Sequence, residues 1–497
     1  MRSTHLFVLF LLSIVLPVGY SSNADDSQLP VSFRLTKERS LDPYGGIPFC
    51  VDLDRNGVVD VLWLQSAGMF YSKVFNVQPW EDRHTDAERQ HFCLTATRAD
   101  GTVMWQMGSP WQGERPFVTH SAERSIDIAD IDGDGQLEVV CVKLGHILII
   151  DATTGHVERS VEAPAARAQI VGLGRRSPRS QHKSASLPQP SAKDGPSHST
   201  ASEARLNDQD YEWNILVKNA ESSYPGFEYA NPIWWYDPQL KRIKTVSYLG
   251  AGHAPQARDL DGDGLDEFLV GFNLIGHDLK TRWTFHPVPT DEWNALEMHV
   301  DDLTVGTANE QTVIAYAASD TAYLVDAKDG SLLWKRQGTH PQHCQVGKFA
   351  GGPAALDVFI HNKRAELQLF NFAGEELYRI MPPTNFPLGQ AQPCRRQKFH
   401  VFDPTTILAG RGAGGTDLLI FTDAGWPYVI DGAGRRCSDL PYTKNAAQDW
   451  GEVPGRPDDF GYGYYARIAD FDGDGHDEVM VNDRRFVWFY EMTKNGD

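Results

Sequence analysis

Positive charge and cysteine are scarce in this sequence. The 497 residues carry 46 Lys and Arg against 66 Asp and Glu, which gives a formal net charge of −20. No basic tract of useful length exists, so the chain has no electrostatic footprint for nucleic acid or for an anionic polymer held by bulk charge alone. Six cysteines are too few to build a disulfide scaffold, and their pairing stays open because six thiols allow many arrangements. Core hydrophobic residues must therefore hold the fold.

Long apolar runs are missing beyond the N-terminus. The run from Leu6 to Val18 follows a basic start, Met1-Arg2, and precedes small polar residues from Ser21. This order is typical of a secretory signal peptide, which we place at residues 1–22, and a buried first strand is the alternative. No later segment reaches the length of a membrane span. We therefore expect a secreted protein, periplasmic or extracellular, with no transmembrane segment.

Convincing helical periodicity is also missing, and an acidic loop recurs instead. Four copies place Asp, Asn or Glu at offsets 1, 3, 5 and 9 of a Gly-containing turn, and a short apolar run follows each copy. The four sets are Asp52, Asp54, Asn56 and Asp60; Asp130, Asp132, Asp134 and Glu138; Asp259, Asp261, Asp263 and Glu267; and Asp470, Asp472, Asp474 and Glu478. Oxygen ligands at alternate residues of a tight loop can converge on Ca²⁺. A turn without metal is the alternative, and the first copy has the weakest ligands.

The spacing of the loops predicts the fold. Weaker copies fill the gaps between them, and Asp-Gly and Thr-Gly pairs between apolar alternations indicate hairpins. Units of roughly 40 to 50 residues predict an all-β chain, a β-propeller of about eight four-stranded blades over residues 31–497. Seven blades, or two β-sandwiches, are the alternatives. Strands from both chain ends are expected to share one blade, and the Ser/Pro-rich segment 175–203 is expected to be a disordered insertion within a blade.

Two resemblances follow from these motifs. The D-x-D-G-D-G loops resemble those of FG-GAP/VCBS-repeat propellers. The stretch 214–284, with NILVKN, WYD and GAGHAPQARDLDGDGLDEFLVG, is similar to secreted bacterial propeller polysaccharide lyases of the rhamnogalacturonan lyase and ulvan lyase type. The resemblance implies a calcium-stabilised, monomeric enzyme that cleaves a uronate-containing polysaccharide by β-elimination. A non-catalytic extracellular binding or adhesion protein built on the same repeats is the alternative.

Histidines gather just before the strands expected to line the central channel. His253, His299 and His343 are each about one blade apart, so we expect them to approach one another. With Cys344 they form a candidate Zn²⁺ site, which the ulvan lyase resemblance favours because those enzymes carry a His/Cys metal site. Two alternatives stay open: one histidine acts as a catalytic base, or the histidines only line the wall of the channel.

Further residues are candidates for the lyase chemistry. His120 is the candidate base, since a neutral imidazole can take the proton next to a uronate carboxylate. Arg124 or Arg258 would neutralise that carboxylate, and His146 follows on the next strand. Tyr229, Tyr236 or Tyr248 would protonate the leaving oxygen. We expect the aromatic group Trp234-Trp235-Tyr236 to belong to the hydrophobic core, and a surface on which sugar rings stack is the alternative. No nucleophile elbow, Walker loop, HExxH or dinucleotide motif occurs.

Overall fold

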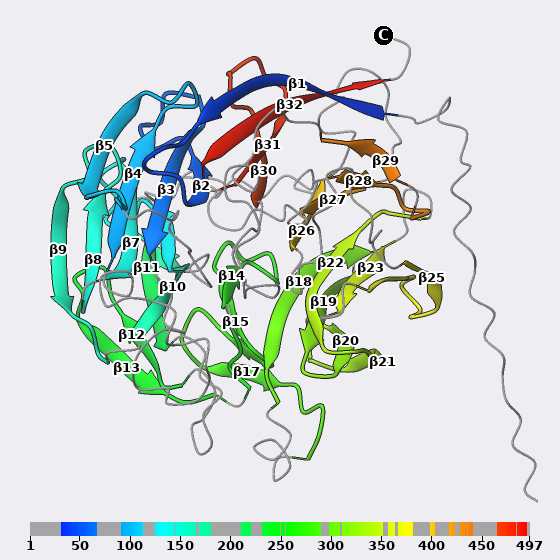
Figure 1. Ribbon diagram of the computed structural model, residues 1–497. Coiled ribbons are helices and arrows are strands. Elements are labelled where there is room, and N and C mark those ends of the chain that lie inside the picture. Colours follow the sequence, from blue (N-terminus) through cyan, green and yellow to red (C-terminus); the bar gives the residue numbers. More distant parts are fainter. Residues whose placement is uncertain are drawn as a thin grey trace, which may run out of the picture.

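Eight four-stranded antiparallel sheets stand in a ring, which is the arrangement of a β-propeller (Figure 1). The predicted fold is therefore confirmed, with eight blades in the part of the chain described. This computed structural model describes residues 31–66, 91–112, 125–143, 145–165, 168–179, 210–219, 231–248, 250–253, 255–289, 298–308, 311–350, 356–362, 366–380, 398–402, 417–422, 428–434, 436–440, 465–483 and 485–494. These residues contain no helix with the length and apolar character of a membrane span.

The blades are numbered in chain order, and their strands run from the innermost to the outermost. Blades 1 to 4 are β2 (Ile47–Val51), β3 (Asp60–Ser66), β4 (Phe92–Thr97), β5 (Val103–Gly108); β6 (Ile126–Ala129), β7 (Glu138–Lys143), β8 (His146–Asp151), β9 (Val157–Glu162); β10 (Ala168–Pro178), β11 (Tyr211–Asn219), β12 (Ile233–Tyr236), β13 (Arg242–Val246); and β14 (Gln256–Arg258), β15 (Glu267–Val270), β16 (Asn273–Ile275), β17 (Thr281–Thr284). Blades 5 to 8 are β18 (Val300–Ala308), β19 (Gln311–Ala318), β20 (Thr321–Asp326), β21 (Leu332–Gln337); β22 (Pro341–Gly347), β23 (Asp357–Asn362), β24 (Leu367–Phe370), β25 (Glu376–Ile380); β26 (Lys398–Phe402), β27 (Leu418–Thr422), β28 (Tyr428–Ile430), β29 (Arg436–Asp439); and β30 (Tyr465–Ala469), β31 (Glu478–Asn482), β32 (Phe486–Lys494), β1 (Val31–Ser40).

The middle strands of a blade are more deeply buried than its outermost strand. All residues of β3 and β7 are buried, whereas β9 at the outer edge alternates between exposed and half-buried positions. A strand covered by blades on both faces reads as a short continuous apolar run, which is why the runs after the acidic loops predicted strands. The core lies between blades. One cluster, for example, joins Leu62 and Leu94 of blade 1 to Val139 and Ile150 of blade 2.

Aromatic side chains on outer strands clasp the next blade. The Trp105 ring of blade 1 covers Gly155 in a turn of blade 2, and its indole Nε1 donates to the Ala152 carbonyl at 2.7 Å. Gly155 has φ +73°, and a Cβ there would lie 2.5 Å from the ring, so this turn requires glycine. Equivalent contacts join Trp283 to Ala327 and Gly330, Trp334 to Phe372 and Gly374, and Tyr378 to Asp431 and Gly434. We call these contacts the aromatic clasps.

The two ends of the chain close the ring, as the sequence predicts. The outermost strand of blade 8 is β1, and it pairs antiparallel with β32 from Val31 opposite Lys494 to Ser40 opposite Phe486. Figure 1 shows this pair as the blue and red strands lying side by side.

One boundary differs from the prediction. Strand β10 continues to Pro178 and pairs with β11, so residues 175–178 are not part of an insertion. The cause is Asp266 of blade 4, which accepts hydrogen bonds from the Arg175 backbone N–H at 2.7 Å and from its guanidinium at 2.9 and 3.1 Å. The rest of the expected insertion, residues 180–203, lies outside the described residues.

Candidate functional site

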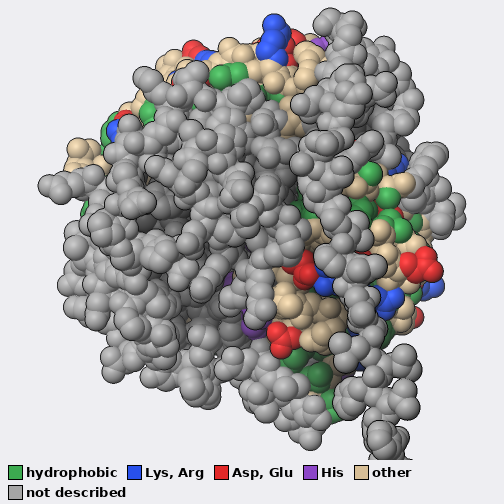
Figure 2. Space-filling view, turned by 45° about the vertical axis from the view of Figure 1, so that its right-hand side comes forward, with side chains coloured by type: hydrophobic (Ala, Val, Ile, Leu, Met, Phe, Trp, Pro, Cys, Tyr) green, Lys and Arg blue, Asp and Glu red, His purple; other side chains and the backbone are tan. Residues whose placement is uncertain are grey.

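The acidic loops and the histidines lie at opposite ends of the blades. Each acidic loop joins the first strand of its blade to the second. His253, His299 and His340 instead precede the first strands β14, β18 and β22 of three consecutive blades. We call the two ends the loop end and the histidine end. Figure 2 shows histidine side chains, in purple, reaching one face of the molecule.

Three imidazoles surround one carboxylate at the histidine end. The Nε2 atom of His253 lies 3.4 Å from Asp301 Oδ1, and the Nε2 atom of His299 lies 3.3 Å from Asp301 Oδ2. The His340 Nε2 atom is 3.8 Å from the same Oδ2. The Asp301 side chain is only 6% exposed, against 11% for His299, 23% for His253 and 28% for His340. The structure therefore builds one centre from blades 4, 5 and 6, which we call the Asp301 cluster.

Two β-bulges place the Asp301 carboxylate. On β18 Val300 pairs with Ala318 and Asp302 with Ala317, so Asp301 is the extra residue. On β22 the extra residue is Gln342, whose Nε2 donates to Asp301 Oδ1 at 2.9 Å. Bulges re-aim side chains and are common beside active sites. The two irregularities face each other across the boundary between blades 5 and 6.

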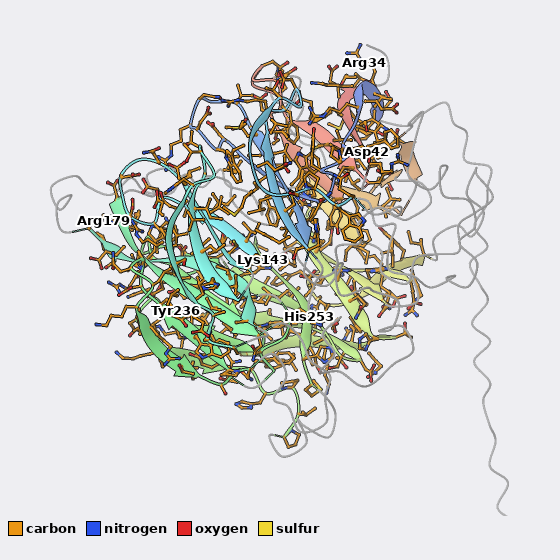
Figure 3. All side chains as sticks on the ribbon, turned by 60° about the vertical axis from the view of Figure 1, so that its left-hand side comes forward. Arg34, Asp42, Lys143, Arg179, Tyr236 and His253 are labelled. Atoms are coloured by element: carbon orange, nitrogen blue, oxygen red, sulfur yellow. The ribbon has the colours of Figure 1, made fainter. Side chains whose placement is uncertain are left out.

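The approach to His253 is built from close backbone contacts. Its backbone N–H donates to the Val300 carbonyl at 3.0 Å. The fully buried Lys218 ammonium donates to the carbonyls of Gly252 at 2.8 Å and His253 at 3.1 Å. Gly252 has φ +64°, and a Cβ there would lie 2.5 Å from the Val300 carbonyl oxygen. The glycine of the GAGHAP motif is thus needed to seat the histidine. In Figure 3 His253 lies toward the inner strands, whereas Tyr236 lies toward the periphery.

His299 is oriented by a serine. Its backbone N–H donates to Ser319 Oγ at 3.2 Å, and the same hydroxyl lies 3.5 Å from the ring Nδ1. This arrangement leaves the Nε2 atom to face Asp301. A hydrogen bond at one ring nitrogen sets which nitrogen is available to a proton or a metal.

Electrostatics keep Asp301 ionised. Burial opposes ionisation, but hydrogen bonds and positive charge from His253 and His299 outweigh burial and hold the pKa of Asp301 well below its usual range. A buried carboxylate of this kind requires a cation beside it. The cation can be an imidazolium or a metal ion that neutral imidazoles help to bind.

The Asp301 cluster fits a transition metal. His253, His299 and Asp301 each offer one ligand atom, and these atoms all lie within 4.8 Å of one another. Two ligands bound to zinc at about 2.05 Å and a tetrahedral angle lie about 3.4 Å apart. The His253 Nε2 atom lies 3.4 Å from Asp301 Oδ1 and the His299 Nε2 atom lies 3.3 Å from Oδ2, so each imidazole has such a separation from one of the two carboxylate oxygens. Imidazole and carboxylate are also the donor types that zinc and its neighbours accept.

The predicted ligands His343 and Cys344 do not belong to the Asp301 cluster. The His343 Nδ1 atom faces Asp302 Oδ2 at 3.5 Å, and its ring stacks on His361 with centroids 5.8 Å apart. Cys344 is fully buried among core residues, donates from Sγ to the Ala315 carbonyl at 3.4 Å, and has its thiol pKa raised well above the usual range by burial. Successive strand residues point to opposite faces, so the two cannot share an ion. His340 lies at the cluster instead.

Asp302 has a structural partner although it neighbours Asp301. Its Oδ2 accepts the Cys344 backbone N–H at 3.3 Å, which ties β18 to the first strand of blade 6. Asp127 makes the same link from blade 2 to blade 3, where it accepts the Leu173 N–H at 2.7 Å. Asp302 therefore serves as a latch between blades, and Asp301 is the carboxylate available for chemistry.

The predicted catalytic residues that the structure describes lie away from the Asp301 cluster. His120, Arg124 and Tyr229 lie outside the described residues. His146 is exposed at the start of β8 in blade 2, and Arg258 ends β14 at the loop end, opposite Glu267. The remaining aromatic candidates are core residues, namely Trp234, Trp235, Tyr236 and Tyr248.

Three of the acidic loops fit a cation. In the second loop Asp130 accepts the N–H groups of Gly133 at 2.6 Å and Gly135 at 2.9 Å. Glu138 Oε2 accepts the Ile131 N–H at 2.8 Å, while its buried Oε1 has no hydrogen-bond partner among the described residues. Burial and nearby carboxylates raise the pKa of Glu138 to about 8. A calcium ion would satisfy this oxygen, and oxygens also converge at Asp259, Asp261 and Asp263, and at Asp470, Asp472, Asp474 and Glu478.

The first loop differs from the other three. Arg98 extends its guanidinium into the loop and binds Asp54 Oδ2 at 2.6 Å and Asp60 Oδ1 at 3.2 Å. Asn56 Oδ1 accepts the Val58 backbone N–H at 2.9 Å, as Asp134 Oδ1 accepts the Gln136 N–H in the second loop, so the difference lies in Arg98. Oxygens of Asp52, Asp54 and Asp60 converge here as they do in the other loops, but the Arg98 guanidinium holds two of these three carboxylates. Calcium at Asp52, Asp54, Asn56 and Asp60 stays a prediction from the sequence.

Comparisons with known proteins agree with the fold. No protein-family model matches the chain. No curated protein sequence matches it either. Among solved structures, the V. cholerae biofilm matrix protein Bap1 is 11% identical with a TM-score of 0.53, covering 92% of this chain and 91% of that chain. BamB from Moraxella catarrhalis is 12% identical, with a TM-score of 0.48 and coverage of 94% and 99%. The exotype rhamnogalacturonan lyase YesX is 14% identical, with a TM-score of 0.48 and coverage of 92% and 74%. Likenesses at these identities concern the fold alone.

Proposed function

We propose that this protein is a secreted, carbohydrate-active propeller that cleaves a uronate-containing polysaccharide by β-elimination at the Asp301 cluster. The observation that carries the proposal is the buried Asp301 carboxylate with three imidazole Nε2 atoms within 4 Å, all on partly exposed side chains at the histidine end. The sequence resemblance of 214–284 to propeller polysaccharide lyases of the FG-GAP/VCBS repeat type supports the choice of reaction.

The cluster supplies the parts that the reaction needs. His253, His299 and Asp301 would hold a zinc-class ion, which supplies a Lewis acid for the substrate carboxylate. His340 is the most exposed imidazole of the cluster and serves as the base. It takes the proton next to the carboxylate, the electron pair forms the carbon–carbon double bond, and the bond to the leaving oxygen breaks. That oxygen must gain a proton, and Tyr229 remains the sequence candidate for this acid.

The proposal also covers location and stability. The signal peptide at residues 1–22 would export the chain, which would act as a monomer on a glycan outside the cytoplasm. Calcium at the three loops with free acidic oxygens would stabilise the blades. A non-catalytic glycan-binding or adhesion protein is the competing function, and it would use the same face without bond cleavage.

Metal content tests the centre. Purified protein is assayed for zinc and other transition metals by elemental mass spectrometry, with Asp301→Asn and Asp302→Asn as a matched pair. We expect one ion per chain in the wild type and in Asp302→Asn, because Asp302 bonds to backbone. Asp301→Asn should lose the ion. Equal metal content in all three proteins would refute the assignment.

Product formation tests the reaction. The protein is incubated with polygalacturonate, rhamnogalacturonan, ulvan and alginate, and the ultraviolet absorbance of the unsaturated uronate is followed. We expect product on at least one polymer, with a loss of at least 100-fold in His340→Ala. The variant His120→Ala is measured alongside, and a comparable loss there with an unaffected His340→Ala would move the base to His120. No product on any polymer from metal-loaded protein would favour the binding function.

A further inference from the structure

Arg98 stands at a position that no other loop-bearing blade fills with a cation. On the third strand, the residue opposite the ninth loop position is Arg98 in blade 1, since Val61 pairs with Thr97 and Asp60 precedes Val61. By the same register, Asp151 is opposite Glu138 in blade 2. Gly276 and Glu491 take this place in blades 4 and 8. The guanidinium in blade 1 is therefore a specific substitution within a repeated frame.

The guanidinium bridges the loop carboxylates as a bound cation would. It contacts the third and ninth loop positions, Asp54 at 2.6 Å and Asp60 at 3.2 Å, and the Asp60 side chain is fully buried. The hydrogen bond from Arg98 holds the pKa of Asp54 below its usual range. The guanidinium is planar, carries five donors and stays charged at every accessible pH, so it can pair with two carboxylates at once. At Asp60 burial outweighs this contact and raises the pKa to about 6.

The first loop is also adapted to receive it. Asp60 replaces the longer glutamate that ends each of the other three loops, and Asn56 replaces an aspartate at the fifth position. A shorter ninth residue leaves room for the planar group, and the missing carboxylate lowers the charge that has to be neutralised. The loop has three carboxylates where the others have four, which suits one positive charge better than two.

The other loops leave oxygens for a metal. In the second loop Arg159 reaches Asp132 at 2.5 Å and Arg55 lies 3.7 Å from Asp130, so each guanidinium contacts one loop carboxylate, and Glu138 keeps a buried oxygen without a partner among the described residues. In the last loop, no Lys or Arg of the described ranges forms an ion pair with Asp472 or Glu478. Asp54 Oδ1 of the first loop is likewise buried without a hydrogen-bond partner among the described residues, so the contrast between the loops rests on the single guanidinium that bridges two carboxylates.

We propose that the Arg98 guanidinium replaces the cation in the first loop, so that the chain binds calcium at three loops and not at four. The inference rests on the proposed calcium binding at the other loops. It adds that the first loop is a latent cation site, which opens when Arg98 is removed. A calcium ion would lie within a few ångströms of the guanidinium, and the repulsion between the two charges excludes joint occupancy.

Calcium counting with matched variants tests this inference. Full-length protein is stripped with chelator and titrated with calcium, and bound ions per chain are counted by equilibrium dialysis. We expect about three ions in the wild type, about two in Asp472→Asn and still about three in Asp54→Asn, which changes the same third position in the first loop. The exposed pair Asp474→Ala and Asn56→Ala repeats the comparison without disturbing the Arg98 contacts, and the same outcome is expected.

The variant Arg98→Gln reveals the latent site. Its thermal midpoint should rise more on calcium addition than that of the wild type, and it should bind one ion more at saturating calcium. A decrease in bound calcium in Asp54→Asn equal to that in Asp472→Asn would overturn the inference while leaving the other loops in place. A chain that binds no calcium at all would overturn the calcium proposal itself, and the Arg98 inference with it.

Discussion

Glu138→Gln should have opposite effects on stability in chelator and in calcium. The pKa of Glu138 is raised from 4.5 to about 8 because the side chain is buried beside other carboxylates. The folded state therefore binds more protons than the unfolded state between these pH values, and stability falls as pH rises through that window. At about 1.4 kcal/mol per pKa unit, the cost without metal is on the order of 4 kcal/mol at pH 8 and roughly 1 kcal/mol at pH 5. Gln removes the charge and can still accept the Ile131 N–H.

The assay is urea denaturation of the wild type and Glu138→Gln at pH 5, 6.5 and 8, in chelator and in excess calcium. In chelator the variant should be more stable, by an amount that grows with pH. In calcium it should be less stable, because it has lost a charged ligand and binding stabilises only the folded state. Asp134→Asn, an exposed carboxylate of the same loop, is the control and should change stability in chelator by less than about 0.5 kcal/mol. Destabilisation by Glu138→Gln in both conditions would refute the reasoning.

Three further predictions concern the clasps, a buried amine and the approach to His253. Trp105→Ala should destabilise the protein by about 3–5 kcal/mol in urea denaturation, whereas Trp105→Phe, which keeps an aromatic ring but loses the indole hydrogen bond and some ring volume, should cost about 1–2 kcal/mol. Burial lowers the pKa of Lys143 to about 8, so Lys143→Met should be more stable than the wild type below pH 8. The unfolded chain holds this proton up to about pH 10.5, so the stability advantage of the variant should disappear between pH 8 and 10.5, as measured by the thermal midpoint. Gly252→Ala should displace His253 and lower metal content at least tenfold, measured by elemental mass spectrometry, while a folded but metal-replete variant would contradict that role.

Much of the fold follows from the sequence because the loops set a frame. The D-x-D spacing fixes where a first strand ends and a second begins, and the apolar run after it shows a strand buried on both faces. Blades 3, 5, 6 and 7 lack complete loops, yet hairpin residues such as Asp329-Gly330 in blade 5 still mark turns. The end of β10 could not be predicted, because its continuation depends on Asp266 of the next blade.

The site was predicted only in part. His253 and His299 were recognised from their positions before first strands, and the structure brings them together. Asp301 was missed as a ligand although it lies two residues after His299, because the segment read as a degenerate acidic loop. His340, and not the predicted His343, lies at the Asp301 cluster. This placement depends on the β-bulge at Gln342, which no local sequence pattern reveals. Arg98 was missed because its contact spans 38 to 44 residues.

The pairing of β1 with β32 sets a constraint on how the chain reaches this fold. The partners are 446 to 463 residues apart, from Ser40 opposite Phe486 to Val31 opposite Lys494, so blade 8 cannot be completed until β32 is available. Pairings between such distant segments are slow, because the entropy of closing the chain must be overcome before the contact forms. Blades 1 to 7 can each form from contiguous sequence, whereas the last blade joins the two ends. A chain that stops before Phe486 would leave β1 and β31 as unpaired edges, which are sites of aggregation.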